Sequence, residues 1–225
     1  MVEIIPAILT NDLTEIEEKL RRIEDLEIGG VNIHRAQIDV IDGVFADNKT
    51  VDPALLSNVD TNLLLDFHLM CDEPVKWIEK SVNAGADRII GQIEKMTNQI
   101  EFVEKVTETG LGVGLAVDID TPISRINPVV LTNIDVVLLM AVKAGFGGQK
   151  FNPKVLDKIR ELDEIRSNDQ TPFKICVDGG ETEEVIDKTH FEGADEVVIG
   201  KRLFIGDMAV NLNRLQEAAH GISKT

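Results

Sequence analysis

Residues 136–151 read VVLLMAVKAGFGGQKF, and this stretch decides how the rest of the chain is interpreted. It begins with an apolar run from Val136 to Val142 and then changes to the glycine-rich segment 145–148. A short continuous apolar run is typical of a strand buried on both faces, as in a parallel sheet. Glycines let the backbone turn freely and let its N–H groups approach an anion. The stretch therefore predicts a buried strand followed by a loop that binds a ligand.

Runs of the same kind recur along the chain, and helical patterns separate most of them. The strand-like runs are 3–9, 36–41, 62–70, 87–93, 111–117, 134–140, 173–178 and 196–200. Apolar residues at helical spacing occur in 12–26, 152–165 and 208–219, the first with Thr10, Asn11 or Asp12 as a candidate cap. Segments AGADRIIGQ (84–92) and EGADEVVIG (192–200) repeat one helix-turn-strand pattern.

This alternation predicts a parallel sheet, and eight units in 225 residues match a (β/α)8 barrel. An open, doubly wound sheet is the alternative. No linker divides the chain, so we expect a single domain over residues 1–225.

The composition limits the possible partners and location. The net charge of −17 argues against general affinity for nucleic acid or anionic lipid. No apolar run reaches the ~18 residues typical of a membrane span, and the start MVEIIPAILTND does not resemble a signal peptide. We therefore expect a soluble, cytoplasmic protein. Cys71 and Cys176 fit no zinc-site spacing.

Polar side chains gather at the predicted carboxyl ends of the strands, where the active site of such a barrel lies. Because side chains alternate along a strand, Gln37 and Asp39 share one face, and His68 shares a face with Met70. Asp178 ends another strand. Buried polar groups cost free energy unless they are paired, so their occurrence together at one end favours a functional site.

Glycines follow the last three strands, in AGFGGQ (144–149), DGG (178–180) and IGKR (199–202). Loops of this kind at neighbouring strand ends predict a phosphate site, to which Lys201 adds a positive charge. The segment GGQKFNP (147–153) is a candidate lid over the substrate.

These segments resemble the ribulose-phosphate 3-epimerase family in order and spacing, over nearly the whole chain. The matching segments are IIPAIL (4–9), IDVIDGVFADNKT (38–50), DFHLM (66–70), LLMAVKAGFGGQKF (138–151), CVDGG (176–180) and GADEVVIGKRLF (193–204). The resemblance implies a ribulose-phosphate-binding barrel that inverts C3 of D-ribulose 5-phosphate to give D-xylulose 5-phosphate. It also implies a divalent metal (Mn, Mg, Fe or Zn), a small phosphorylated sugar as substrate and a homo-oligomer.

The resemblance also assigns residues. Asp39 and Asp178 would be the acid-base pair, and the metal ligands would be Asp39, His68, Asp178 and Gln37, which stands at a histidine position of the family. The substrate-binding residues would be Ala7, His68, Met70, Met140, Gly145, Phe146, Gly147, Gly148, Gly179, Gly180, Gly200 and Lys201. The chain departs from the family pattern at Ala7, Gln37, Asp47, Gln92, Ala144 and Lys201.

Four alternatives stay open at this point, three for the function and one for the site. The substrate could be another ketose phosphate such as allulose 6-phosphate, or the chain could be a related lyase or decarboxylase. Those enzymes typically carry an Asp-x-Lys-x-x-Asp signature, and DVIDG (39–43) has no lysine. A phosphate-binding module without turnover is the third alternative. Gln37, finally, could donate its amide N–H to an oxyanion in a metal-free site.

Overall fold

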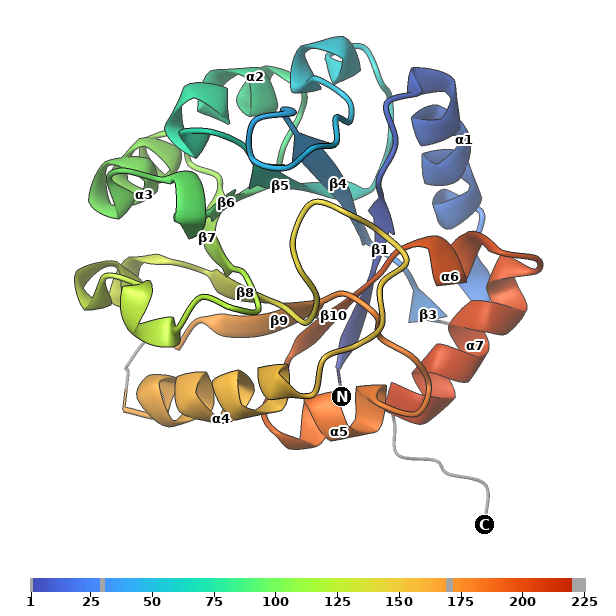
Figure 1. Ribbon diagram of the computed structural model, residues 1–225. Coiled ribbons are helices and arrows are strands. Elements are labelled where there is room, and N and C mark those ends of the chain that lie inside the picture. The colour runs from blue at the N-terminus through green and yellow to red at the C-terminus, as the bar shows by residue number, and fades with distance from the viewer. Residues whose placement is uncertain (1, 29–30, 169–171, 220–225) are drawn as a thin grey trace.

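The computed structural model describes residues 2–28, 31–168 and 172–219. Within these ranges, eight parallel strands close into a barrel in the order β1-β10-β9-β8-β7-β6-β5-β4 (Figure 1). The strands are β1 (Glu3–Ile8), β4 (Arg35–Ile41), β5 (Leu64–Met70), β6 (Arg88–Gln92), β7 (Gly112–Val117), β8 (Val136–Met140), β9 (Lys174–Asp178) and β10 (Glu196–Ile199). The predicted (β/α)8 barrel is confirmed, and the open sheet is wrong.

Helices surround the strands on the outside of the barrel (Figure 1). The α-helices are α1 (Leu13–Glu24), α2 (Ile78–Asn83), α3 (Gln99–Glu108), α4 (Lys154–Arg166), α5 (Ile186–Phe191), α6 (Lys201–Phe204) and α7 (Met208–Ala219). Short 3-10 helices are η1 (Pro53–Leu56), η2 (Pro74–Trp77), η3 (Ile93–Lys95), η4 (Ile123–Arg125) and η5 (Pro128–Asn133). Helix α1 shows why they form: the Asp12 side chain accepts from the N–H groups of Thr14 and Glu15, and Ile16, Leu20 and Ile23 are buried.

One feature was not predicted. Strands β2 (Glu27–Ile28) and β3 (Val31–Asn32) form a separate antiparallel pair outside the barrel. Each has two residues, which is too short for an alternating pattern to be recognised.

The period-two alternation of the strands divides the buried side chains into two sets. One large apolar core fills the space between strands and helices, and it includes Phe67, Leu115 and Ile175. A second, smaller cluster fills the inside of the barrel with residues such as Ile5, Leu138 and Val198. Buried polar residues lie at both ends of this apolar layer. Those at the amino ends of the strands are called the lower residues, and those at the carboxyl ends, called the upper residues, form the site described next.

No helix in the described residues is long and apolar enough to cross a bilayer.

Candidate functional site

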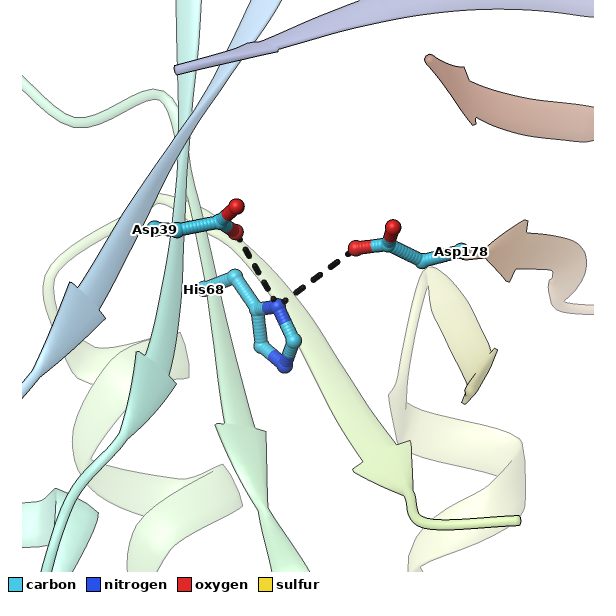
Figure 2. Close-up of side chains that lie close together, drawn as sticks. All are labelled: Asp39, His68 and Asp178. Atoms are coloured by element: carbon cyan, nitrogen blue, oxygen red, sulfur yellow. Dashed lines mark ion pairs between the residues drawn. The ribbon is translucent and has the colours of Figure 1, made fainter. Parts of the chain in front are cut away.

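Strand register brings Asp39, His68 and Asp178 together at the carboxyl ends of their strands. Asp39 on β4 is the direct neighbour of His68 on β5, and Asp178 ends β9 beside Met140 of β8. Figure 2 shows the two carboxylates approaching the imidazole from two sides. One candidate ligand atom from each residue lies within 4.8 Å of the others. The three polar side chains that the sequence predicted for this end therefore form one cluster.

The contacts within this cluster are short and mostly sheltered from water. His68 Nδ1 lies 3.3 Å from Asp39 Oδ1 and 3.8 Å from Asp178 Oδ2. Gln37 Nε2 donates to the same two oxygens, at 2.8 Å each. His68 is fully buried, and Asp39 and Gln37 are nearly so. The amide of Gln37 thus bridges two carboxylates that would otherwise repel each other.

The buried charges change the proton affinity of the cluster. Burial, together with the negative charge of Asp39, raises the pKa of Asp178 to about 7, although His68 and Gln37 act in the opposite direction. Burial disfavours a charged imidazole, but the nearby carboxylates of Asp39 and Asp178 raise the pKa of His68 above its usual value. Asp178 can therefore hold or release a proton near neutral pH.

The donor set fits a divalent cation. His68 Nδ1 is buried and has no hydrogen-bond partner among the described residues, yet it faces two carboxylate oxygens. A nitrogen lone pair and carboxylate oxygens in this arrangement are suitable ligands for Mn²⁺, Mg²⁺ or Zn²⁺. Gln37 behaves differently from the expected oxygen ligand, because its Nε2 and not its Oε1 faces the carboxylates.

A cavity of about 1250 Å³ opens above the cluster. Asp39 and Asp178 line it, as do eleven of the twelve predicted substrate-binding residues, namely Ala7, Met70, Met140, Gly145, Phe146, Gly147, Gly148, Gly179, Gly180, Gly200 and Lys201. The twelfth, His68, is fully buried and lies outside this lining. In this structure His68 contacts the carboxylates of Asp39 and Asp178, and its contact with a substrate stays a prediction.

The glycine loops pack against each other at the cavity. The loop after β8 lies across the mouth of the barrel (Figure 1), and Asn48 donates to the carbonyl of Gly145 at 2.8 Å. A Cβ at Gly180 would lie 2.3 Å from the backbone N of Phe151, and one at Gly179 would lie 2.5 Å from a methyl of Val142. Both glycines also have positive φ. They are required for the packing of the loops, in addition to any role in binding.

Two parts of this region were not recognised from the sequence as functional. Gln92 Oε1 lies 3.3 Å from His68 Nε2, and Gln92 Nε2 donates to Glu94 at 3.0 Å. Glu181, directly after the DGG turn, is buried, with the hydroxyl of Thr189 as its hydrogen-bond partner. Burial raises the pKa of Glu181 to about 8. Both carry a signal in the sequence, since Gln92 interrupts an apolar run and Glu181 follows a glycine pair.

Solved structures with a similar fold are sugar-phosphate enzymes and their structural relatives. The 3-hexulose-6-phosphate synthase of Salmonella typhimurium matches with a TM-score of 0.65 at 14% identity, covering 99% of this chain and 100% of the other. At this identity the similarity establishes the fold alone.

Sequence comparison is more specific. The ribulose-phosphate 3-epimerase of Bacillus subtilis is 35% identical over 208 residues, which cover 91% of this chain and 93% of the relative. That of Chlamydia muridarum is 37% identical over 231 residues, covering 98% and 97%. The model of the ribulose-phosphate 3-epimerase family matches residues 3–204. Together with the barrel and the Asp-His-Asp cluster at its mouth, these matches place the chain in the ribulose-phosphate 3-epimerase family.

Proposed function

We propose that the protein inverts C3 of D-ribulose 5-phosphate to give D-xylulose 5-phosphate. The observation that carries the proposal is that the carboxylates of Asp39 and Asp178 face each other from two sides of His68 (Figure 2) and line one cavity. Epimerisation beside a ketone needs a base on one face of the carbon and an acid on the other. Relatives that share 35–37% identity over nearly the whole chain carry the name of this activity.

The two carboxylates take different roles in the proposed reaction. Asp39 removes the C3 proton from one face, and the electron pair moves toward the ketone to give an enediolate. Asp178 then delivers a proton to C3 from the opposite face. In the absence of a bound cation, burial and the charge of Asp39 raise the pKa of Asp178 to about 7, so this carboxyl can take up a proton from water near neutral pH.

The substrate phosphate is proposed to bind at the loops that end β8, β9 and β10. Gly147, Gly148, Gly179, Gly180 and Gly200 line the cavity there, where their backbone N–H groups would bind the phosphate, and Lys201 adds a positive charge. In a chain with a net charge of −17, such local groups must hold an anion, because the overall field does not attract one.

The residues proposed to hold a divalent cation are Asp39, His68 and Asp178. When bound, the cation supplies Lewis-acid stabilisation of the developing negative charge on the ketone oxygen. An amide oxygen from Gln37 would complete a set that favours Mn²⁺ or Mg²⁺ over Zn²⁺. In the alternative, one of the Gln37 N–H groups, which here donate to Asp39 and Asp178, would donate to the oxyanion instead.

A second candidate substrate is a hexulose phosphate such as allulose 6-phosphate. The observation that favours it is the size of the cavity, which at about 1250 Å³ exceeds the 300–1,000 Å³ common for small-molecule sites. Homo-oligomer formation and a cytoplasmic location remain predictions.

The test is turnover of both ketose phosphates, with and without a chelator, in deuterated water. We expect the C3 proton of ribulose 5-phosphate to exchange with solvent, and we expect chelation to slow this exchange. If neither substrate exchanges its C3 proton under any condition, the proposed function is wrong. If ribulose 5-phosphate exchanges at full rate in chelator, only the metal part fails.

A further inference from the structure

We propose that Gln92, held in place by Glu94, is a positioning residue that keeps the Nδ1 lone pair of His68 free and directed at Asp39 and Asp178. This inference rests on the proposed use of His68 as a metal ligand, but it makes a separate claim about which ring nitrogen carries the proton.

The argument starts at Glu94. Its Oε2 accepts from Gln92 Nε2 at 3.0 Å, and its Oε1 accepts from the backbone N–H of Asp118 at 2.8 Å. Both oxygens are therefore acceptors, as expected of an ionised carboxylate. Such a group can face only the NH₂ side of the Gln92 amide, so the orientation of that amide is determined.

The orientation of Gln92 then determines the tautomer of His68. With its NH₂ side on Glu94, the amide presents Oε1 to His68 Nε2, 3.3 Å away. An amide oxygen only accepts, so Nε2 of the ring must be the nitrogen that carries hydrogen. A neutral imidazole has one N–H, and Nδ1 is therefore left bare.

Without this contact the opposite tautomer would be favoured. Nδ1 is 3.3 Å from one carboxylate oxygen and 3.8 Å from another. Two anionic acceptors attract a proton to the nitrogen that faces them, and a protonated Nδ1 cannot bind a metal. His68 and Gln92 are both fully buried, so water does not compete for Nε2. The amide thus offsets the pull of the carboxylates, in the way that hydrogen bonds to the second nitrogen orient metal-binding histidines elsewhere.

The test is the tautomer of His68, measured by long-range ¹H–¹⁵N correlation in metal-free protein at a pH where the ring is neutral. His190 provides an internal reference, because its Nδ1 lies 3.0 Å from the carbonyl oxygen of Ala194 and must carry the proton. We expect the wild-type spectrum to show opposite patterns for the two rings. A wild-type His68 protonated at Nδ1 would overturn the proposal without any variant.

The variant Gln92→Met keeps the size of the side chain and removes the amide. We expect its His68 to shift toward the Nδ1-protonated form, and we expect Mn²⁺ binding, measured by calorimetry, to weaken by about 10–100-fold. The matched control is Gln99→Met. Gln99 also uses both ends of its amide, toward Arg125 and Asn127, but it is not bonded to His68. The control should change neither readout.

The two proposals fail in different ways. An unchanged tautomer and unchanged Mn²⁺ affinity in Gln92→Met would overturn the role of Gln92 while leaving the epimerase proposal intact. If the tautomer shifts in Gln92→Met but the wild type exchanges no C3 proton, the role of Gln92 is supported and the proposed function is rejected.

Discussion

The barrel contains two clusters of polar side chains, one at each end, and they differ in their positive charge; in the lower one Asp66, Arg88 and Glu196 are buried and Lys174 is exposed. The lower cluster comprises Arg35, Asp66, Arg88, Lys174 and Glu196, near the amino ends of the strands. Arg88 donates to Asp66 and to Glu196, Arg35 to Asp66, and Lys174 to Glu196. Each carboxylate there has two permanent cations as partners.

The upper cluster comprises Gln37, Asp39, His68 and Asp178, and it has two carboxylates without such partners. Within the described chain, the groups facing them are an imidazole and an amide. Unpaired buried charges are costly. The upper cluster therefore depends on a proton or a bound cation, which is the property expected of a site for acid-base chemistry, while the lower cluster is complete without a ligand.

The largest expected effect is loss of activity when the upper carboxylates are neutralised. Asp39→Asn and Asp178→Asn should each slow the conversion of ribulose 5-phosphate to xylulose 5-phosphate by about 10²–10⁴-fold, because one face of C3 loses its acid or base. Both variants should remain folded, since removing one of two adjacent negative charges relieves repulsion. The measurement is the rate of interconversion of the two epimers, together with thermal unfolding. Full activity in either variant would contradict the assigned roles.

The lower cluster should respond in the opposite way. Arg88→Met leaves Asp66 and Glu196 with fewer cations in a buried setting, which should cost about 3–5 kcal/mol of unfolding free energy. The folded fraction should keep its activity, because Arg88 is remote from the cavity lining. Denaturant unfolding and activity per folded molecule are the two measurements. The comparison between the clusters fails if Arg88→Met is as stable as the wild type.

Replacing Gln37 with the histidine of the family tests the upper cluster more finely. Gln37→His exchanges an amide for an imidazole nitrogen, so metal affinity should rise by about 10–100-fold and preference should move toward Zn²⁺. Calorimetric titration with Mn²⁺ and Zn²⁺ measures both changes. Gln99→His is the control, because Gln99 bonds to the backbone of Arg125 and Asn127 and to no residue of the upper cluster. Unchanged affinity would mean that residue 37 does not contact the metal.

The sequence predicts the barrel well, because few other folds accommodate eight apolar runs that are separated by helical patterns. It also predicts that Asp39, His68 and Asp178 meet, since the period of two and the shared strand end are sufficient. The orientation of Gln37 and the bonds of Gln92 depend instead on contacts between strands that are distant in sequence. The lower cluster was not predicted either, because its members are also far apart in the sequence; Arg88 and Glu196, for example, are separated by 108 residues.

The smallest expected effect concerns Glu181, a buried carboxyl whose hydrogen-bond partner is the neutral hydroxyl of Thr189. Unlike the carboxylates of the lower cluster, it is paired with no cation among the described residues. Burial, aided by the charge of Asp178, raises its pKa from 4.5 to about 8, and the Thr189 hydroxyl only partly offsets this. Because the folded pKa exceeds the unfolded one, the folded state favours the protonated form. The resulting stability is fully present below pH 4.5 and is lost as the pH rises through about 8.

Glu181→Gln removes this dependence, since an amide does not ionise in this range. Near pH 8 the variant should be more stable than the wild type by at least about 1 kcal/mol, or about 2–4 °C in Tm. Near pH 5 the two proteins should unfold at similar temperatures. Asp178 is common to both proteins, so the difference between the two Tm curves reports Glu181. Glu183→Gln, at a partly exposed neighbour with a 3.5 Å contact to Arg202, is the control and should follow the wild type. If the curves of Glu181→Gln and wild type run parallel from pH 5 to pH 9, Glu181 is ionised throughout, and its burial must be compensated by a positive charge, as in the lower cluster.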